Sequence, residues 1–392
     1  MRFGLDLPPQ MRVYGAFFVY SFCMGSFFPR LGEIRDAMGV EEGALGLGLI
    51  GAPAGTLVAL TFANPFLEKI GYRRAILMLI PLLSVFYAIS VFAPTPLALF
   101  LLLLPVGVLI GCIEIIINLE ADRTEHLLGR RIMNRSHAFW SFGFFSAGFV
   151  GASIAQIGIS PQWHLVGMIP VVIAGTAILL GRFDPAPHRA GASSAAAPAF
   201  AAPTLGIMVL VTVTLSAMIM EGAGIDWSSI YIYDEFAVTP LTPFLAGFAV
   251  ALGAGTQGIT RFFADSFVER YSPVAVARTL LVVLGIGCLC VFFAVAEWMA
   301  LLGFGLMGVG TSVIFPLAMS AAAQRTDRSA AINVAALAQI SFVAFLLGPP
   351  LLGFVAERWG IRWSFGIGLP LVVLSFLVAG SLGRKPLPHA IA

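Results

Sequence analysis

Long apolar runs with almost no charged residues fill most of this chain, and they constrain its fold more than any other feature. Of its 392 residues, 59% are hydrophobic and only 11% are charged. Soluble domains carry roughly a quarter charged residues, so this composition predicts a protein that lies in a lipid bilayer. A membrane β-barrel would alternate apolar and polar residues along each strand, so uninterrupted apolar runs favour spanning helices.

Twelve apolar runs are long enough to cross a bilayer, because a spanning helix needs about 20 apolar residues. The predicted spans are 12–37, 44–68, 73–93, 97–121, 132–157, 162–182, 204–233, 241–268, 274–296, 298–323, 330–357 and 361–383. Between the sixth and seventh runs, residues 184–203 are rich in Ala, Ser and Pro and lack apolar periodicity. We therefore expect a six-helix N-terminal half over 1–183, a flexible cytoplasmic linker over 184–203 and a six-helix C-terminal half over 204–392.

The positions of Lys and Arg set the predicted orientation of these helices. With both termini in the cytoplasm, eighteen Lys and Arg residues fall at cytoplasmic helix ends and four fall at the opposite ends. The four are Arg30, Arg35, Arg358 and Arg362. A helix count changed by one would remove this asymmetry. We therefore predict twelve spans with both termini cytoplasmic, and an uncleaved first span, since no small-residue cleavage site follows it.

The two halves match each other at an offset of about 200 residues. Residues 66–69 (Phe-Leu-Glu-Lys) follow the second run, and residues 267–270 (Phe-Val-Glu-Arg) follow the eighth. Asn134 and Asn333 correspond in the same way. An ordered series of matches at a near-constant offset indicates an internal repeat. Two six-helix repeats around a central cavity are the architecture of a secondary transporter.

The loop between the second and third predicted helices, residues 64–73, reads Asn-Pro-Phe-Leu-Glu-Lys-Ile-Gly-Tyr-Arg. It resembles the motif Gly-x-x-x-Asp-Arg/Lys-x-Gly-Arg-Arg/Lys of the major facilitator superfamily, with Glu68 in place of Asp and departures at Asn64 and Tyr72. The resemblance covers nearly the whole chain. It implies a cytoplasmic motif that favours the outward-open state through ion pairs between the halves. The residues assigned to it are Glu68, Lys69, Gly71, Arg73, Arg261 and Asp265.

Three further stretches, residues 114–118, 133–143 and 221–227, are similar to one bacterial branch of that superfamily. The branch includes the inner-membrane protein YbjJ and the rhizopine transporter MosC, and it is related to sugar and fucose permeases. It usually has Asp where Glu114 stands. The resemblance implies a secondary active transporter of the bacterial inner membrane that works by alternating access. Its cargo would be a small polar organic solute such as a sugar or cyclitol, coupled to protons.

Ionisable side chains inside a span cost several kcal/mol unless they are paired or hydrated, so each needs an explanation. Glu114 shares one face of the fourth predicted helix with Gly107, Gly111 and Asn118. We predict that Glu114 binds the coupling proton and that His137 on the fifth helix relays it. The alternatives are a structural hydrogen bond for Glu114 and simple packing for His137. The complete set of proton-coupling candidates is Glu114, His137, Glu221 and Asp226.

Uncharged amides and hydroxyls beside aromatic rings suit a hydroxylated solute better than a multivalent ion. Such side chains occur in both halves of the chain. The predicted substrate contacts are Asn118, Trp140, Ser141, Trp227, Gln257, Thr311 and Gln339. Interior aromatic residues of spans also commonly serve as core, which is the alternative for Trp140.

The first and seventh predicted helices are related by the repeat, and each carries charges near its outer end. We predict that Arg30 pairs with Asp226 or Glu221 as an outer gate that closes when the cavity opens inward. A permanent structural ion pair is the alternative.

Other functions fit the sequence less well. Proton-driven efflux of amphipathic drugs or metabolites needs the same fold and is the nearest alternative. An intramembrane enzyme acting on a lipid, with Glu114 and His137 as acid and base, is remote because no nucleophile or metal constellation accompanies the repeat. We predict no enzyme activity, cofactor, metal site or nucleic-acid partner, given a net charge of only +2. The expected partners of this monomer are the solute, a proton and the lipid bilayer.

Overall fold

The computed structural model describes residues 4–187 and 201–383, and over this part of the chain every regular element is helical. Residues 188–200 of the predicted linker lie outside the described residues. The N-terminal part forms α1 (Pro9–Gly25), η1 (Phe28–Arg30), α2 (Leu31–Met38), α3 (Glu42–Leu49), α4 (Gly51–Phe62), α5 (Asn64–Ile70), α6 (Tyr72–Ser90), α7 (Pro96–Leu128), α8 (Met133–Gln156) and α9 (Pro161–Leu180).

The C-terminal part forms α10 (Leu205–Asp226), α11 (Ser228–Glu235), α12 (Thr242–Tyr271), α13 (Pro273–Phe292), α14 (Glu297–Thr311), α15 (Ile314–Ala323), α16 (Ala330–Trp359), α17 (Ile361–Gly366), α18 (Gly368–Val378) and η2 (Ala379–Leu382). Within residues 4–187 and 201–383, ten helical stretches are long and apolar enough to cross a membrane. The first and eighth predicted spans do not meet that criterion, because α1 has 17 residues and α12 carries several glycines and polar side chains. The protein is therefore an all-α, multi-pass membrane protein, while twelve crossings and cytoplasmic termini stay predictions.

The segments related by the repeat, the first and the seventh, are both broken near the same end of the molecule. Ser26 ends α1, and Pro29 lies in η1 before α2 begins. Proline lacks a backbone N–H and fixes its own φ, so it interrupts a helix. Trp227 separates α10 from α11. These breaks bring α2 and α11 into contact with each other.

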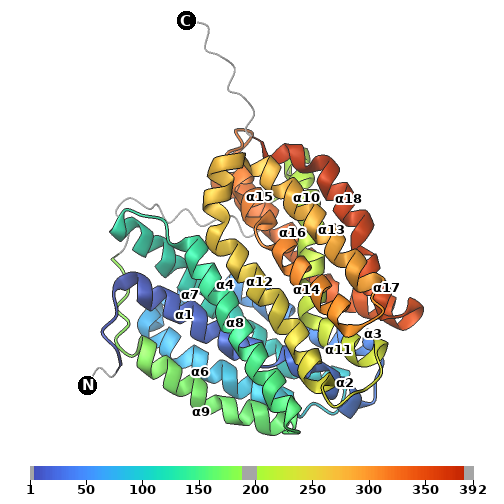
Figure 1. Cartoon of the computed structure of the whole chain (residues 1–392). Coiled ribbons are helices and arrows are strands. Elements are labelled where there is room, and N and C mark those ends of the chain that lie inside the picture. Colours follow the sequence, from blue (N-terminus) through green and yellow to red (C-terminus); the bar gives the residue numbers. More distant parts are fainter. Residues whose placement is uncertain (1–3, 188–200, 384–392) are drawn as a thin grey trace, which may run out of the picture.

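Two groups of helices, α1–α9 and α10–α18, converge where α2, α3 and α11 lie and diverge toward the start of α1 and the end of α18 (Figure 1). Two helix pairs join the groups: α8 packs along α12, and α3 packs against α16. The repeat exchanges these pairs, so the arrangement has the pseudo-twofold symmetry that the sequence predicts. We call the region formed by η1, α2, the start of α3, α11 and the end of α16 the closed end.

Glycine residues allow the helices α3 and α16 to approach each other closely. A Cβ atom on Gly46 of α3 would lie 2.6 Å from the carbonyl oxygen of Pro349 in α16. A Cβ on Gly353 would lie 2.5 Å from the carbonyl oxygen of Glu42. In lipid, close contact between small residues replaces the hydrophobic effect as the source of helix association. The closed end is therefore sealed by backbone contact.

Candidate functional site

A small cavity lies between α8, α10, α12 and α14. Three predicted substrate contacts, Trp140, Gln257 and Thr311, line it, as does the carboxylate of Glu221. Most of the remaining wall consists of apolar side chains and glycines. An apolar pocket with a few convergent polar groups is typical of a small-molecule site.

Trp140 lines this cavity and carries a buried donor without a partner in the described structure. Its indole stacks on Phe144, with ring centroids 5.3 Å apart and an interplanar angle of 25°. Its Nε1–H is buried and has no hydrogen-bond partner among residues 4–187 and 201–383. A buried donor without an acceptor costs about 1–3 kcal/mol, so a ligand acceptor here would be stabilising.

A chain of buried polar side chains crosses between the helix groups beside the cavity. Ser141 of α8 donates to Gln257 Oε1 at 3.4 Å, and Gln257 Nε2 donates to Thr311 Oγ1 at 3.5 Å. These distances are at the long limit for hydrogen bonds. The three predicted contacts Ser141, Gln257 and Thr311 therefore form one network, held loosely enough to be rearranged.

Arg261 extends this network. Its Nε donates to the Ser312 carbonyl oxygen at 2.9 Å, and its Nη1 donates to Ser141 Oγ at 3.3 Å. Its Nη2 lies 3.6 Å from Glu221 Oε1, an ion pair longer than a hydrogen bond. Arg261 therefore joins the two helix groups beside the cavity, and its assignment to the cytoplasmic motif stays a prediction.

The other members of the predicted cytoplasmic motif lie apart from the cavity. Asp265 accepts a hydrogen bond from Asn134 of α8, so it joins the two helix groups. Arg73 donates to the Gly181 carbonyl oxygen at 2.7 Å and so bonds within its own group. Glu68 and Lys69 lie on α5, and Gly71 after them has a φ of +83°, which favours glycine.

Glu114 faces α1, the helix at the core of the N-terminal group. Asn118 donates to Glu114 Oε2 at 2.8 Å, and the Tyr20 hydroxyl also donates to this carboxylate. In the described part of the chain no Lys, Arg or His forms a salt bridge with it. On the predicted shared face, a Cβ on Gly107 would lie 1.8 Å from the Ala52 carbonyl oxygen, so α7 and α4 touch there as expected.

The remaining charged candidates have few contacts. The His137 ring meets Phe17 edge to face, with centroids 5.1 Å apart, and it lies within electrostatic range of Arg261. Asp226 is buried at the end of α10. Within the described ranges it forms no salt bridge. The proton-coupling roles of these residues stay predictions.

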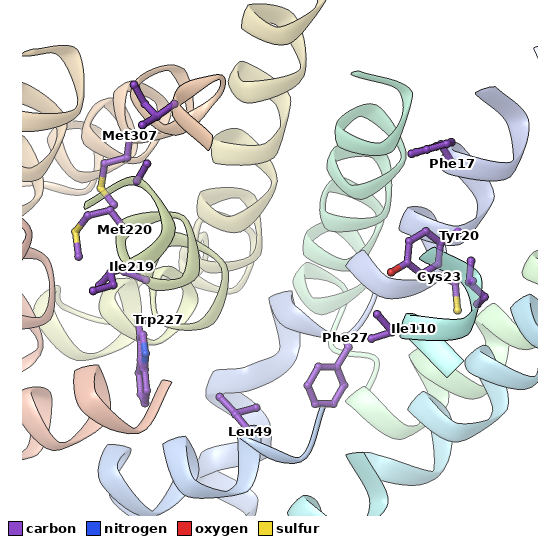
Figure 2. Close-up of a cluster of buried hydrophobic side chains, with 14 of the residues drawn as sticks. Phe17, Tyr20, Cys23, Phe27, Leu49, Ile110, Ile219, Met220, Trp227 and Met307 are labelled. Carbon is purple, nitrogen blue, oxygen red and sulfur yellow. The ribbon is translucent and has the colours of Figure 1, made fainter. Parts of the chain in front are cut away.

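Four of the seven predicted substrate contacts lie outside the cavity wall: Asn118 and Ser141, described above, and Trp227 and Gln339. Trp227 is fully buried at the closed end, where a Cβ on Gly353 would lie 3.0 Å from its ring. Figure 2 shows Trp227 extending away from Met220 and Met307, among the buried hydrophobic side chains of the core. Gln339 accepts a hydrogen bond from the Ala201 backbone N–H at 3.0 Å. Trp227 is therefore a packing residue in this conformation.

At the closed end, the arginine that joins the two groups is Arg35 and not Arg30. Arg30 is fully buried and bonds within its own group, to Glu33 and to the Ile159 carbonyl oxygen at 2.6 Å. Within the described residues, Arg30 forms an ion pair with neither Asp226 nor Glu221. The break at Pro29 turns the Arg30 side chain toward α9, which explains the difference.

Arg35 forms a two-pronged ion pair with Asp234. Its Nη1 and Nη2 lie 2.6 and 2.8 Å from the two carboxylate oxygens, and Glu42 also accepts from Nη1 at 2.6 Å. Nearby, Ser229 donates to the Pro29 carbonyl oxygen at 3.2 Å. These partners are 199 and 200 residues apart, so each group meets its repeat counterpart across the pseudo-twofold axis. The offset of about 200, applied to Arg35, would have identified this pair from the sequence.

Two pseudo-symmetric groups of membrane helices, closed at one end beside an apolar cavity with a few polar groups, define a secondary membrane transporter. Comparisons with known proteins agree with this class. A family profile described as Major Facilitator Superfamily matches residues 209–390. An uncharacterized MFS-type transporter of Yersinia pestis is 26% identical over 90% of both chains. An uncharacterized transporter of Sinorhizobium fredii is 28% identical over 92% of this chain and 94% of its own.

Membrane protein MosC of Rhizobium meliloti is 22% identical over 88% of this chain and 83% of its own. Among solved structures, nucleoside transporter NupG has a TM-score of 0.66 at 14% identity, covering 97% of this chain and 100% of its own. The E. coli fucose:proton symporter FucP has a TM-score of 0.59 at 17% identity, covering 96% and 99%. The C-terminal half of the chain thus matches the major facilitator superfamily, and nearly the whole chain is similar to MFS-type transporters and to MosC. The protein is a transporter of small molecules and not an enzyme.

Proposed function

We propose that this transporter carries a small hydroxylated organic solute, such as a sugar or cyclitol, across the bacterial inner membrane together with protons. The observation that supports this most is the cavity wall, where the unpartnered Trp140 N–H lies near the amide of Gln257 and the hydroxyl of Thr311. A nucleoside transporter and a fucose:proton symporter among the structural neighbours support the same class of cargo.

The cavity suits the two faces of such a solute. The indole of Trp140, stacked on Phe144, offers a flat apolar surface for the C–H face of a ring. Gln257 and Thr311 offer donors and acceptors to hydroxyl groups, and their bonds with neighbours are long enough to exchange for bonds with solute. New hydrogen bonds to the solute would therefore compensate for the long internal hydrogen bonds that break when the solute binds.

Alternating access follows if the halves 1–183 and 204–392 tilt about the cavity. The distribution of Lys and Arg assigns the closed end to the outer face, so the conformation described is open toward the cytoplasm. The ion pair between Arg35 and Asp234 takes the gate role that the sequence suggested for Arg30. It must break when the outer end opens.

Glu114 is our first candidate for proton coupling, and Glu221, Asp226 and His137 are the others. Glu114 receives hydrogen bonds from Tyr20 and Asn118, and both donors are neutral. Protonation of such a carboxylate breaks no salt bridge. It would change the hydrogen bonding between α1 and α7, and α1 leads directly to the broken segment at the closed end.

Sealed vesicles with an imposed pH gradient test this proposal. Labelled sugars, cyclitols and a few cationic dyes would be offered to the wild type, to Glu114→Gln and to Asp122→Asn. Asp122 is the control, an exposed carboxylate on the same helix α7. We expect gradient-driven accumulation of a hydroxylated solute by the wild type and by Asp122→Asn. Glu114→Gln should still exchange solute but should no longer accumulate it.

Three other results would change the conclusion. Accumulation retained in Glu114→Gln would move the coupling site to another carboxylate. Movement of dyes without sugars or cyclitols would favour efflux of amphipathic compounds. No movement of any offered solute would contradict the proposed cargo class.

A further inference from the structure

Arg261 is a largely buried cation, and the groups around it balance only part of its positive charge. Its side chain is 15% exposed, and its hydrogen-bond acceptors, Ser312 O and Ser141 Oγ, are neutral. The carboxylate of Glu221 lies 3.6 Å away, without a hydrogen bond between the two in the described structure. A cation inside a membrane costs several kcal/mol unless it is paired, and such residues commonly mark a substrate path.

The guanidinium lies at the edge of the solute cavity. Gln257, one turn earlier on α12, and Glu221 on α10 both line that cavity. The other titratable group facing Arg261 is His137 of α8. The junction of α14 and α15 contributes only the backbone oxygen of Ser312. One positive and one negative side chain therefore meet at one side of an otherwise neutral wall.

We propose that the solute carries a carboxylate, which Arg261 binds in place of Glu221. This inference rests on the proposed function and narrows its cargo to a hydroxylated monocarboxylic acid, such as a sugar acid. The planar guanidinium can bind a carboxylate through two parallel N–H donors. The ring and hydroxyls of the same solute then lie against Trp140, Gln257 and Thr311.

The charges of the cavity favour a monoanion over other charged solutes. A phosphate ester carries up to two negative charges, and Glu221 would repel it. Among the described lining residues there is no Lys or Arg to balance a second negative charge. A cationic solute would pair with Glu221 and leave Arg261 buried without any counter-charge. When the solute carboxylate replaces the Glu221 carboxylate, Arg261 has a negatively charged partner both before and after binding.

This exchange also assigns a consequence to Glu221. When the solute carboxylate binds the guanidinium, the Glu221 carboxylate loses its ion pair with Arg261. It can then accept a proton from the cavity while the solute is bound. Release of the solute returns Glu221 to Arg261 and releases that proton. No bond other than the O–H bond forms or breaks in this step.

Binding to the purified full-length protein in nanodiscs tests the inference without relying on transport. Three matched pairs of an acid and a neutral compound serve as probes: glucuronate and glucose, gluconate and glucitol, quinate and inositol. Glucose 6-phosphate and glucosamine test the dianionic and cationic alternatives. The variants are Arg261→Gln, Arg261→Lys and Glu221→Gln. The matched control is Arg270→Gln, an exposed arginine near the end of the same helix α12.

In at least one pair the acid should bind the wild type at least tenfold more tightly than its neutral partner. Arg261→Gln should lose that preference, and Arg261→Lys should retain part of it. Glu221→Gln should bind the acid at least threefold more tightly, because the competing carboxylate is gone. A purely structural role for the ion pair would weaken binding of the acid in both Arg261→Gln and Glu221→Gln. Weaker binding in Arg261→Gln together with tighter binding in Glu221→Gln therefore distinguishes a binding role from a structural one.

Equal binding of acid and neutral partner in all three pairs, including no binding by either, would overturn the inference. So would tighter binding of glucosamine or glucose 6-phosphate than of glucuronate. If a neutral sugar is accumulated by the pH gradient without any preference for acids, the proposed function stands and this inference fails. If acids bind through Arg261 but no gradient drives them, proton coupling fails and this inference stands.

Discussion

The closed end and the central cavity join the same two helix groups, yet they use contacts of different quality. At the closed end, Arg35 holds Asp234 through two bonds of 2.6 and 2.8 Å, and Gly46 lets α3 touch the backbone of α16. Beside the cavity, the contacts between Ser141, Gln257 and Arg261 measure 3.3 to 3.4 Å. In the described part of the chain, both regions contain buried donors without a partner, Arg30 Nη1 and Trp227 Nε1 at the closed end and Trp140 Nε1 beside the cavity, so the regions differ in the length of the bonds that join the two groups.

This difference indicates that the two regions have different roles: the closed end stabilises one conformation, and the cavity binds the solute. A contact with ideal geometry stabilises one conformation, and a transporter needs such a contact only while one side is closed. A contact that is long and incompletely satisfied can be exchanged for a bond to solute at little cost. We therefore expect substitutions at the closed end to shift the conformational equilibrium, and substitutions in the cavity to shift affinity.

The largest effect should come from filling the glycine contact at the closed end. In Gly46→Val, even the Cβ would lie 2.6 Å from the Pro349 carbonyl oxygen, so α3 and α16 cannot stay in contact. Overpacking costs roughly 1–3 kcal/mol, which disfavours the closed conformation by roughly 5- to 150-fold. Transport should fall by at least about tenfold.

The same variant should expose the buried interface to the outside. A cysteine introduced at Ser229, which is fully buried at the closed end, serves as the reporter for a membrane-impermeant maleimide. It should react in the Gly46→Val background and be protected in the wild-type background. Gly167→Val is the control, since no atom lies within 4 Å of a Cβ there. Equal protection in all backgrounds would refute the idea that the glycine contact seals this end.

A smaller effect of the same kind is expected from Arg35→Gln or Asp234→Asn. Each change leaves the glycine contacts intact but removes the charge-assisted pair between the groups. With the side chains 12% and 28% exposed, the pair should contribute about 1 kcal/mol, or roughly fivefold in labelling at position 229. The exchange variant Arg35→Asp with Asp234→Arg should restore protection. Failure of the exchange to do so would limit the pair to a local structural role.

Trp140→Phe should lower affinity without affecting the closed end. The change keeps a ring to stack on Phe144 but removes the unpartnered N–H donor. One lost hydrogen bond of about 1 kcal/mol corresponds to roughly fivefold weaker solute binding. Trp163→Phe, at a residue 74% exposed on α9, should leave binding unchanged. Unchanged affinity in Trp140→Phe would mean that the indole N–H does not contact the solute.

The smallest predicted effect concerns Asp327, between α15 and α16. Hydrogen bonds from Arg325 above all, and also from Asn333 and Thr204, hold the pKa of Asp327 below its usual value. A lowered folded-state pKa stabilises the protein above the unfolded value of about 3.9, and this gain is lost as the pH falls through the folded pKa. Asp327→Asn should therefore lower the Tm by about 1 °C at neutral pH and by less in acid.

The control for that measurement is Asp122→Asn, whose carboxylate is exposed on α7. Its Tm should match the wild type across the same pH range. A Tm difference for Asp327→Asn that grows on acidification would contradict the assigned direction of the pKa.

Much of the fold was predictable from the sequence because the bilayer imposes a minimum length on each apolar run. Polar residues inside those runs are few, so Trp140, Ser141, Gln257 and Thr311 could be proposed as a site, and the structure brings them together. The partners of Arg261 could not be predicted, because hydropathy does not tell which side chains of other helices a residue meets. The structure places Arg261 against Glu221 and Ser141 beside the cavity.

The gate and the role of Trp227 could not be predicted from hydropathy alone. Arg30 and Arg35 are close in sequence on a broken helical segment. The repeat offset relates Arg35 to Asp234, and the structure shows that Arg30 bonds within its own group. Trp227 is an interior aromatic residue, and an apolar run does not tell whether such a ring packs against a helix or lines a cavity.

The most direct test of alternating access is to lock the closed end with a disulfide. A Cβ on Gly32 would lie 3.8 Å from Ser229 Oγ, so Gly32→Cys with Ser229→Cys places two thiols across the pseudo-twofold axis. Exchange of the solute identified in the vesicle screen would be measured before oxidation, after oxidation and after reduction, beside both single variants. The account predicts that only the oxidised double variant stops transporting and that reduction restores it. Undiminished transport with the disulfide fully formed would contradict it.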